Sequence, residues 1–257
     1  MIFGKHINRY YIRFLPLILL GLGALVLVDW MQLLIPGLYE LVINGMNTGT
    51  VTVDGAVVKS ADVKIDETKA VIAIDGTPLV IKKHLYLLLN KPRGYVSSTE
   101  GHDGAYVLEL VPRELYRDGL FPAGRLDKDT TGMMVITDDG QMAHRILAPK
   151  KHVKKKYLVT LDIPPTEEMV NRFKEGISLS EGLTKPAEME ILEGNTAYVT
   201  LVEGRYHQIK RMFGSCGATV VGLHRVSMGN LTLPDDLPVG EMRELTEEEL
   251  KLLEELV

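Results

Sequence analysis

The feature that most constrains the fold of this chain is the close spacing of short strands and tight turns from Thr50 onward. The runs Val51–Val53 and Ala56–Val58 are separated by Asp54-Gly55, and this dipeptide between two apolar runs is typical of a β-hairpin. Further strand-like runs alternate with segments that carry helix start and stop signals. This order of elements predicts an α+β fold with a largely antiparallel sheet.

The later elements are predicted from apolar runs and capping residues. Thr166 can cap a helix that Gly176 ends, and Thr246 with Glu249 forms a capping box. The strand that begins at Leu85 is expected to break at Asn90-Lys91-Pro92. The other expected strands are Val71–Ile74, Tyr157–Leu161 and Ala197–Val202, and the other expected helices are Asp139–Leu147 and His207–Cys216, the latter ended by Gly217.

The first 47 residues have a different character. Phe14–Val28 is an uncharged run of 15 residues, and mostly apolar residues continue to Tyr39. A membrane helix needs about 20 apolar residues, so this run is borderline. We expect a hydrophobic helix with possible membrane contact through residues 14–39, its basic flank on the cytoplasmic side. A buried helix and a signal peptide are the alternatives.

Charge and cysteine content limit the partners and cofactors. The net charge of −5 argues by itself against a nucleic-acid partner, but the signs are segregated. Glu241–Glu255 is strongly acidic, whereas Lys150–Lys156 contains five lysines and a histidine. A local basic patch can bind phosphates whatever the total charge, because screening removes charges beyond roughly 8 Å. The single cysteine, Cys216, excludes an internal disulfide framework, and no Cys–His cluster predicts a metal.

A charged loop bracketed by glycines, Gly124–Gly132, is the first candidate for chemistry. Asp127 lies in it beside Arg125 and Lys128, and a nucleophilic aspartate must be ionised to attack. A cation about 4 Å away would stabilise the carboxylate by about 4 kcal/mol at an effective dielectric of 20. A solvated surface turn is the alternative interpretation, because Asp and Gly are common in turns.

Two basic segments are the other candidates. Lys154-Lys155-Lys156-Tyr157 can be a solvated loop entering a strand, or a phosphate-binding track that ends in an aromatic ring able to stack on a base. In the segment Glu203–Phe213, His207, Lys210 and Arg211 share one helix face by their i, i+3 and i+4 spacing. The helix N-terminus adds partial positive charge to that face.

Together these segments resemble the bacterial pseudouridine synthases that act on ribosomal RNA, in particular the small-subunit type. The resemblance rests on "GRLDKDTTG", "ITDDGQMAHRI", "KKYLVTL", "LTKPAE" and "EGRYHQIKRMF", which occur in the order of that family, and on the tail "LHRVSMGNLTL" with "LPVGEMRELTEEE". It covers the chain from about Thr50 to the C-terminus. The family normally begins with an S4-type RNA-binding domain. Here its strands are matched by "TGTVTVDGAVVKSADVKID", while its two basic helices are replaced by the foreign apolar segment.

The resemblance implies the roles of four residues. Asp127 matches the nucleophile, and Arg125 matches the arginine that helps to displace the target base from its stack. Tyr157 matches the aromatic residue that packs on the uracil and is implicated in proton removal. Lys210 matches the basic partner of the nucleophile, which is arginine in many relatives. A lysine supplies the charge without the bidentate fork.

The resulting prediction is an RNA pseudouridine synthase that isomerises a specific uridine, in small-subunit rRNA, without a cofactor. The alternatives are a large-subunit rRNA synthase, a non-catalytic RNA-binding ribosome-assembly protein and a membrane-protein fragment. We expect a monomer in the cytoplasm that acts on rRNA or a partly assembled subunit. The expected domains are residues 1–47, 48–83 and 84–257. The predicted RNA contacts are Lys150, Lys151, Lys154, Lys155, Lys156, Arg205, His207, Gln208 and Arg211.

Overall fold

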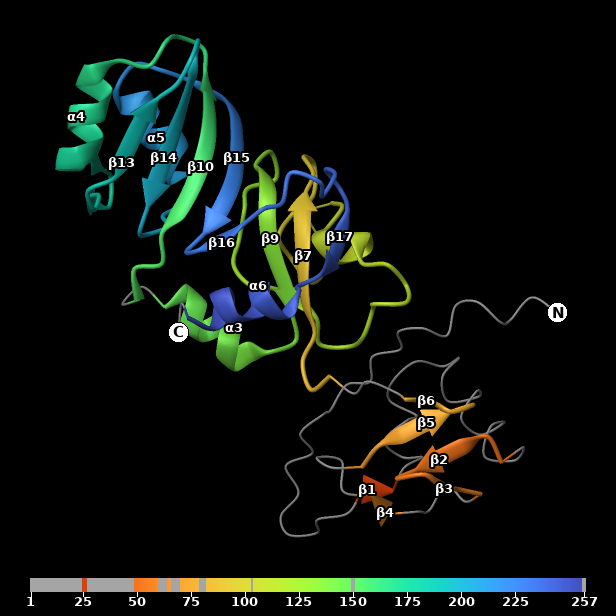
Figure 1. Ribbon diagram of the computed structural model, residues 1–257. Helices are drawn as coiled ribbons and strands as arrows, with labels where there is room; N and C mark the ends of the chain where they lie inside the picture. The colour runs from red at the N-terminus through yellow and green to blue at the C-terminus, as the bar shows by residue number, and fades with distance from the viewer. Residues whose placement is uncertain are drawn as a thin grey trace. The chain divides into compact units, whose positions relative to one another are not determined.

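The computed structural model describes residues 25–26, 49–59, 64–65, 70–78, 82–102, 104–148 and 151–255. The chain divides into two compact units (Figure 1). The first unit comprises Met1–His84 with Pro112–Asp118, and the second comprises Leu85–Val111 with Gly119–Val257. Residues 112–118 therefore group with the first unit, although they lie inside the sequence range expected for the catalytic domain.

The described part of the first unit contains a four-stranded antiparallel sheet in the order β3-β2-β5-β6. The predicted hairpin is confirmed, since Thr52 pairs with Val57 across the turn. Asp54 and Gly55 both have positive φ, as a tight two-residue hairpin turn requires. The strands are β2 (Val51–Val53), β3 (Ala56–Val57), β5 (Ile72–Ile74) and β6 (Thr77–Pro78).

Two residues of the apolar N-terminal run are described, and they are not helical. Leu25–Val26 forms strand β1, which pairs with β4 (Lys64–Ile65). The helix expected over this run is therefore wrong at these two residues, because their backbone groups pair with another strand. The rest of the run, and with it the expected membrane contact through residues 14–39, lies outside the described residues. Within the described residues, no helix has the length and apolar character that a bilayer crossing needs.

We expect a shortened chain that begins at Gly49 to keep the fold of the second unit. The two main hydrophobic clusters contain only residues of that unit, from Tyr86 onward. Sedimentation and thermal melting of the shortened and full chains test this expectation. An insoluble or unfolded shortened protein would show that the second unit needs the first 48 residues.

The second unit is built on one large mixed sheet, whose main path runs β13-β14-β10-β15-β9-β7-β17 (Figure 1). All of its strand pairs are antiparallel except the β15–β9 pair, which confirms the largely antiparallel α+β fold. Its strands are β7 (Tyr86–Lys91), β8 (Phe121–Pro122), β9 (Thr131–Thr137), β10 (Lys155–Leu161), β13 (Glu188–Ile191), β14 (Thr196–Leu201), β15 (Val220–Met228), β16 (Leu231–Thr232) and β17 (Met242–Glu244).

The two halves of this sheet have separate hydrophobic cores. One core joins β7 and β9 to α3 (Gly140–Leu147) and α6 (Glu247–Glu254). The other joins β10, β13 and β14 to α4 (Glu167–Glu175) and α5 (Gln208–Ser215). Figure 1 shows α4 and α5 beside the β13–β15 half, and α3 and α6 beside β7 and β9. A short hairpin, β11 (Ser178–Leu179) with β12 (Gly182–Leu183), and a 3₁₀ turn at Val107–Leu110 complete the described elements.

The capping signals in the sequence are confirmed. The Thr166 side chain accepts a hydrogen bond from the Met169 N–H of α4, and Gly176 caps the other end of that helix. The helix expected over Asp139–Leu147 begins one residue later, because Asp139 is its N-cap and accepts hydrogen bonds from the first turn of α3. Thr246 and Glu249 form the complete capping box of α6. Helix α5 begins at Gln208, because His207 has a left-handed conformation with φ of 47° and stays outside the helix. The prediction was therefore one residue too long at that end.

Strand β7 does not break at Asn90. Asn90 and Lys91 continue the ladder by pairing with Met133 and Gly132 of β9, and the strand ends before Pro92, which has no N–H to donate. The polar side chain of Lys91 thus enters the interior, with 0% exposure. The tertiary pairing with β9 overrides the local turn signal.

The two halves of the sheet meet just after the Gly124–Gly132 loop. There β9 pairs in parallel with β15, through Thr131 opposite His224 and Gly132 opposite Arg225. A Cβ atom on Gly132 would lie 2.4 Å from the Arg225 carbonyl oxygen, and the φ angle of Gly132 is 100°. Only glycine fits this close approach, so the end of the loop is fixed against β15.

Candidate active site

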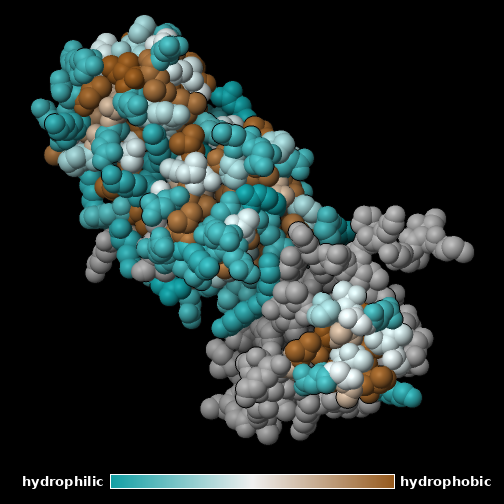
Figure 2. Space-filling view, viewed as in Figure 1, coloured by the Kyte–Doolittle hydropathy of each residue, from teal (hydrophilic) through white to brown (hydrophobic). Residues whose placement is uncertain are grey.

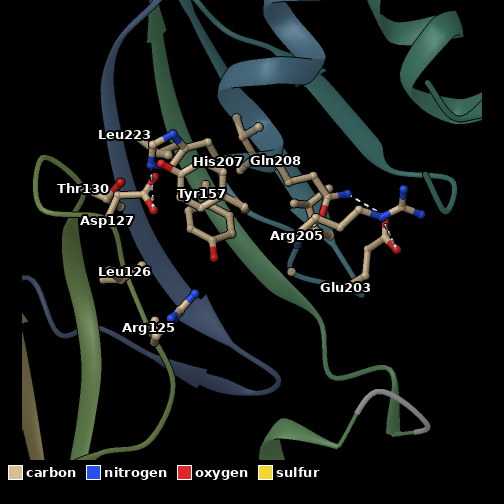
Figure 3. A pocket seen from close by; sticks show the side chains of 14 residues that line it. Arg125, Leu126, Asp127, Thr130, Tyr157, Glu203, Arg205, His207, Gln208 and Leu223 are labelled. Carbon is tan, nitrogen blue, oxygen red and sulfur yellow. Dashed lines mark hydrogen bonds and ion pairs between the residues drawn. The ribbon is translucent and has the colours of Figure 1, made fainter. Parts of the chain in front are cut away.

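A cleft of about 140 Å³ lies in the second unit between the Gly124–Gly132 loop and the segment before α5 (Figure 3). Tyr157 of β10 and Leu223 of β15 also line it. Figure 3 shows Asp127 and His207 close together, with Tyr157 beside them and Arg125 and Arg205 farther out. The cleft therefore collects side chains from four segments that are separated in the sequence.

The Asp127 carboxylate has two basic neighbours. The Lys210 ammonium donates a hydrogen bond to Oδ2 at 3.0 Å. Nε2 of His207 lies 3.6 Å from Oδ1, on the other oxygen. The carboxylate thus has an ammonium group against one oxygen and an imidazole near the other.

Lys210 is shared between two carboxylates. It also donates to Oδ1 of Asp129 at 2.5 Å. Burial acts to lower the pKa of the Lys210 ammonium, but the hydrogen bonds to Asp129 and Asp127 outweigh it and raise the pKa above its usual value. Burial likewise acts to raise the pKa of Asp129, and the hydrogen bond and charge of Lys210 outweigh it and lower that pKa. Lys210 thus stays charged, with Asp129 holding it in place.

Lys91 holds the Gly124–Gly132 loop by hydrogen bonds to its backbone. Its ammonium donates to the carbonyl oxygens of Thr130 at 2.8 Å, Pro92 at 3.1 Å, Asp127 at 3.2 Å and Lys128 at 3.5 Å. Burial, partly opposed by the charges of Asp129 and Asp127, lowers the pKa of Lys91 from its usual 10.5 to about 8. Lys91 binds backbone carbonyl oxygens rather than carboxylates, so it positions the loop without pairing with the Asp127 side chain.

Tyr157 and Arg125 have side chains that are available to a ligand. The Tyr157 side chain is half-buried in the cleft, and its hydroxyl makes no hydrogen bond with the described residues. Arg125 is exposed at the margin and has no hydrogen bond or ion pair within the described part of the chain. An aromatic ring in the cleft and an unrestrained guanidinium at its edge fit the contacts that hold an unpaired nucleotide.

The segment from Glu203 to Gln208 is held together by its own polar groups. The Gln208 side chain is 4% exposed; it accepts from the Arg205 backbone N–H at 2.9 Å and donates to Glu203 at 2.6 Å. The Arg205 guanidinium donates to Glu203 and to the carbonyl oxygens of Gly182 and Leu183. These contacts fix the shape of the cleft wall.

Arg211 points to the β11–β12 hairpin instead of sharing a charged face with Lys210. Its guanidinium makes a two-pronged contact with Glu181 and also donates to Ser180. The hydrogen bond from Arg211 lowers the pKa of Glu181, and the hydrogen bond to Glu181 raises that of Arg211. Of the three residues that share a helix face by their spacing, only His207 and Lys210 meet Asp127.

The lysines before Tyr157 do not form a single row. Strand alternation in β10 places Lys155 on the face of Tyr157, where its Nζ donates to the Val153 carbonyl oxygen. Lys154 pairs with Glu188 at 2.9 Å. Lys156 lies 3.9 Å from the centre of the Tyr198 ring and 3.9 Å from Glu190. Lys151 is exposed, and Lys150 lies outside the described residues.

Two residues at the site were missed from the sequence. Lys91 was taken as part of a strand break, although a lysine after an apolar strand, before Pro92, was the available signal. Asp129 was counted only as a member of a charged loop. Asp129 lies two residues after Asp127, a spacing that lets both carboxylates bind one cation. The sequence alone does not show that this cation is Lys210. Among the described residues, no cluster of three or more His, Cys, Asp or Glu side chains could hold a metal ion.

Comparison with known proteins identifies the class. The family model for RNA pseudouridylate synthases matches residues 85–215, which include the Asp127 loop, Tyr157 and Lys210. The chain belongs to this family, whose members are isomerases that convert uridine to pseudouridine in RNA.

Individual relatives agree with this assignment. The chain is 44% identical over 214 residues to the ribosomal small subunit pseudouridine synthase A of Yersinia pestis, covering 82% of this chain and 90% of that protein. It is 46% identical over 204 residues to the protein of the same name from Escherichia coli strain K12, covering 78% and 87%. A crystal structure of a pseudouridylate synthase is similar with a TM-score of 0.62 and 40% identity, covering 84% of this chain and 93% of that one.

The position of the lysines leads to a prediction about RNA affinity. Each phosphate contact that is lost should flatten the dependence of log affinity on log salt by about one unit. Replacing Lys154, Lys155 and Lys156 together by alanine is expected to flatten this slope, with Lys155 accounting for at least half of the change because it shares the face of Tyr157. Lys174→Ala, at an exposed lysine of α4, serves as the control. An unchanged slope in the triple variant would remove the segment from the RNA interface.

Proposed function

We propose that this chain isomerises a specific uridine of small-subunit ribosomal RNA in the cleft around Asp127. The observation that carries the proposal is the contact between Asp127 and Lys210 in the cleft that Tyr157 also lines. The relatives named as small-subunit pseudouridine synthases, at 44% and 46% identity, support the choice of substrate. The proposal places the enzyme in the cytoplasm, where ribosomal subunits are assembled, and as a monomer.

The reaction breaks two bonds, from the ribose carbon to the uracil nitrogen and from carbon 5 of that uracil to its hydrogen. It forms a bond from the ribose carbon to carbon 5, and the released nitrogen takes up a proton in place of the one that carbon 5 loses. All atoms of the substrate stay in the product, so the overall change needs no external group. The base must first leave its stack, at a cost of a few kcal/mol. The cleft must then retain the detached uracil while it turns, which requires contacts on more than one side.

The proposal gives each of four residues a role in the reaction. Asp127 acts on the nucleotide as the nucleophile, and Lys210 pairs with its carboxylate. The Tyr157 ring packs on the uracil, and its unbonded hydroxyl is available for proton removal. Arg125 makes no hydrogen bond or ion pair with the described residues. Its side chain can therefore move into the space that the target base leaves.

The RNA contacts are proposed to surround this centre. Lys155 lies on the same face of β10 as Tyr157, and Lys150, Lys151, Lys154 and Lys156 extend the positive charge around the start of that strand. His207 and Arg205 line the cleft wall. Gln208 and Arg211 have their side chains engaged within the protein, so their contribution is to hold that wall in shape.

The proposal is tested by incubating the purified protein with partly assembled small and large subunits from cells that lack the gene. Pseudouridine is then mapped in both rRNAs. We expect one new pseudouridine in the small-subunit rRNA. Modification of large-subunit rRNA alone would assign the other substrate. Binding without modification would favour a non-catalytic assembly protein.

A further inference from the structure

Tyr206 is an exposed aromatic residue at the rim of the cleft that no role yet explains. Its side chain is 69% exposed, although it lines the same cleft as Asp127 and Tyr157. The ring is stacked on that of His207, with centroids 3.8 Å apart and an angle of 20° between the planes. The stack covers one face of the Tyr206 ring and leaves the other face open to solvent.

The backbone is bent to make this stack. His207 has φ of 47° and ψ of 35°, a left-handed conformation that is uncommon for residues other than glycine. This bend brings the rings of two adjacent residues together. Such strained conformations persist only where the surroundings hold them, and they cluster at functional sites.

The surroundings hold this bend through hydrogen bonds on both sides. Arg211 donates to the Tyr206 carbonyl oxygen at 3.1 Å and is itself fixed by Glu181. On the other side the buried Gln208 side chain accepts from the Arg205 N–H. The exposed ring is therefore carried by a rigid segment, and a rigid surface loses less entropy when it binds.

The stack borders the nucleophile. His207 Nε2 lies 3.6 Å from the Asp127 carboxylate, and the Tyr206 ring stacks on the same His207 ring, so His207 contacts both Asp127 and Tyr206. Tyr157 already supplies an aromatic surface for the target base inside the cleft. A second aromatic surface at the rim is therefore free to take a different base.

We propose that Tyr206, backed by His207, is a stacking platform for the nucleotide adjacent to the target uridine. The inference rests on the proposed function. When a uridine leaves its stack, its neighbour loses a stacking partner, and an exposed aromatic face replaces that partner. Stacking tolerates any base, because every base has a π face. The platform stabilises the opened RNA and does not read its sequence.

The first test measures equilibrium binding of a single-stranded nine-nucleotide RNA with one central uridine between adenosines. The full-length chain carries Asp127→Asn, so that the RNA is not converted. Tyr206→Ala is expected to weaken binding by at least about fivefold, whereas Tyr206→Phe stays within about twofold. Tyr206→Leu, which keeps apolar bulk without a ring, is expected to behave like the alanine variant. Equal affinity for the alanine variant and its parent, or no binding of this RNA by the parent at low salt, would overturn the proposal.

The second test removes the base on one side of the uridine or the other, leaving the sugar in place. At the position that stacks on Tyr206, the missing base and Tyr206→Ala are expected to weaken binding no further together than either does alone. At the other position the two losses should add. Additive losses at both positions would overturn the proposal that Tyr206 stacks on a neighbouring base. The melting temperature of each variant shows whether it is folded. Neither binding test needs turnover, so a failure of the proposed reaction is seen separately, as an absence of pseudouridine in rRNA.

Discussion

Asp127→Asn is expected to lower the rate of pseudouridine formation by at least about a thousandfold while the protein stays folded. The amide has nearly the shape of the carboxylate but cannot act as a nucleophile. Lys210 keeps its contact with Asp129, so the cleft retains its charged partner. The measurement is the single-turnover rate on partly assembled small subunits.

Asp129→Asn is the matched control for this experiment. It changes the neighbouring carboxylate, which contacts the same lysine, and leaves Asp127 in place. We expect a loss of less than about tenfold, because part of the positioning of Lys210 is lost but the nucleophile remains. Turnover by Asp127→Asn above a tenth of the parent rate, or an equal loss in both variants, would refute the assignment of Asp127.

Lys91→Ala is expected to lower the free energy of unfolding by about 3–5 kcal/mol and to reduce turnover at the same time. The substitution leaves a cavity where a 0% exposed side chain lay, which costs about 2–5 kcal/mol for side chains of similar size. It also removes the donor from carbonyl oxygens of Asp127 and Thr130, and an unsatisfied buried acceptor costs about 1–3 kcal/mol. The loop that carries Asp127 then loses its support.

The control for Lys91→Ala is Lys174→Ala, at an exposed lysine in the last turn of α4. We expect its free energy of unfolding to change by less than about 1 kcal/mol. Chemical denaturation of both variants gives the comparison. A Lys91→Ala protein with the stability and turnover of its parent would show that the loop is held by other contacts.

The contribution of Lys91 to stability is also expected to depend on pH. Its pKa is about 8 in the folded protein and near the usual 10.5 in the unfolded chain. Between these values the unfolded chain binds the proton that the folded protein has released, so the free energy of unfolding rises with pH. The stability gap between the parent and Lys91→Ala should therefore widen from pH 8 toward pH 10.5. A gap that narrows over this range would contradict the lowered pKa.

Local signals in the sequence predicted the secondary structure well. The capping residues Thr166 and Thr246 act within one turn of their own helices, so their effect does not depend on the rest of the fold. The Asp54-Gly55 hairpin is local in the same way. Tertiary pairing explains the failure at Lys91, because the ladder with β9 carries the strand past a signal that favours a break.

The site could be predicted only in part. Asp127 and Lys210 are 83 residues apart, and only the family resemblance indicated that they meet. The lysines before Tyr157 are contiguous in sequence, yet strand alternation separates Lys155 from its neighbours. The left-handed conformation of His207 was invisible in the sequence, because it depends on contacts that Arg211 and Gln208 make after folding.

The most direct test of the central claim is a map of pseudouridine in rRNA from cells with the gene, without it, and with the gene encoding Asp127→Asn. We predict that one small-subunit pseudouridine is present in the first strain and absent from the other two, while the mutant protein accumulates to the parent level. A map that is identical in all three strains would contradict the account, as would restoration of the modification by the Asp127→Asn protein.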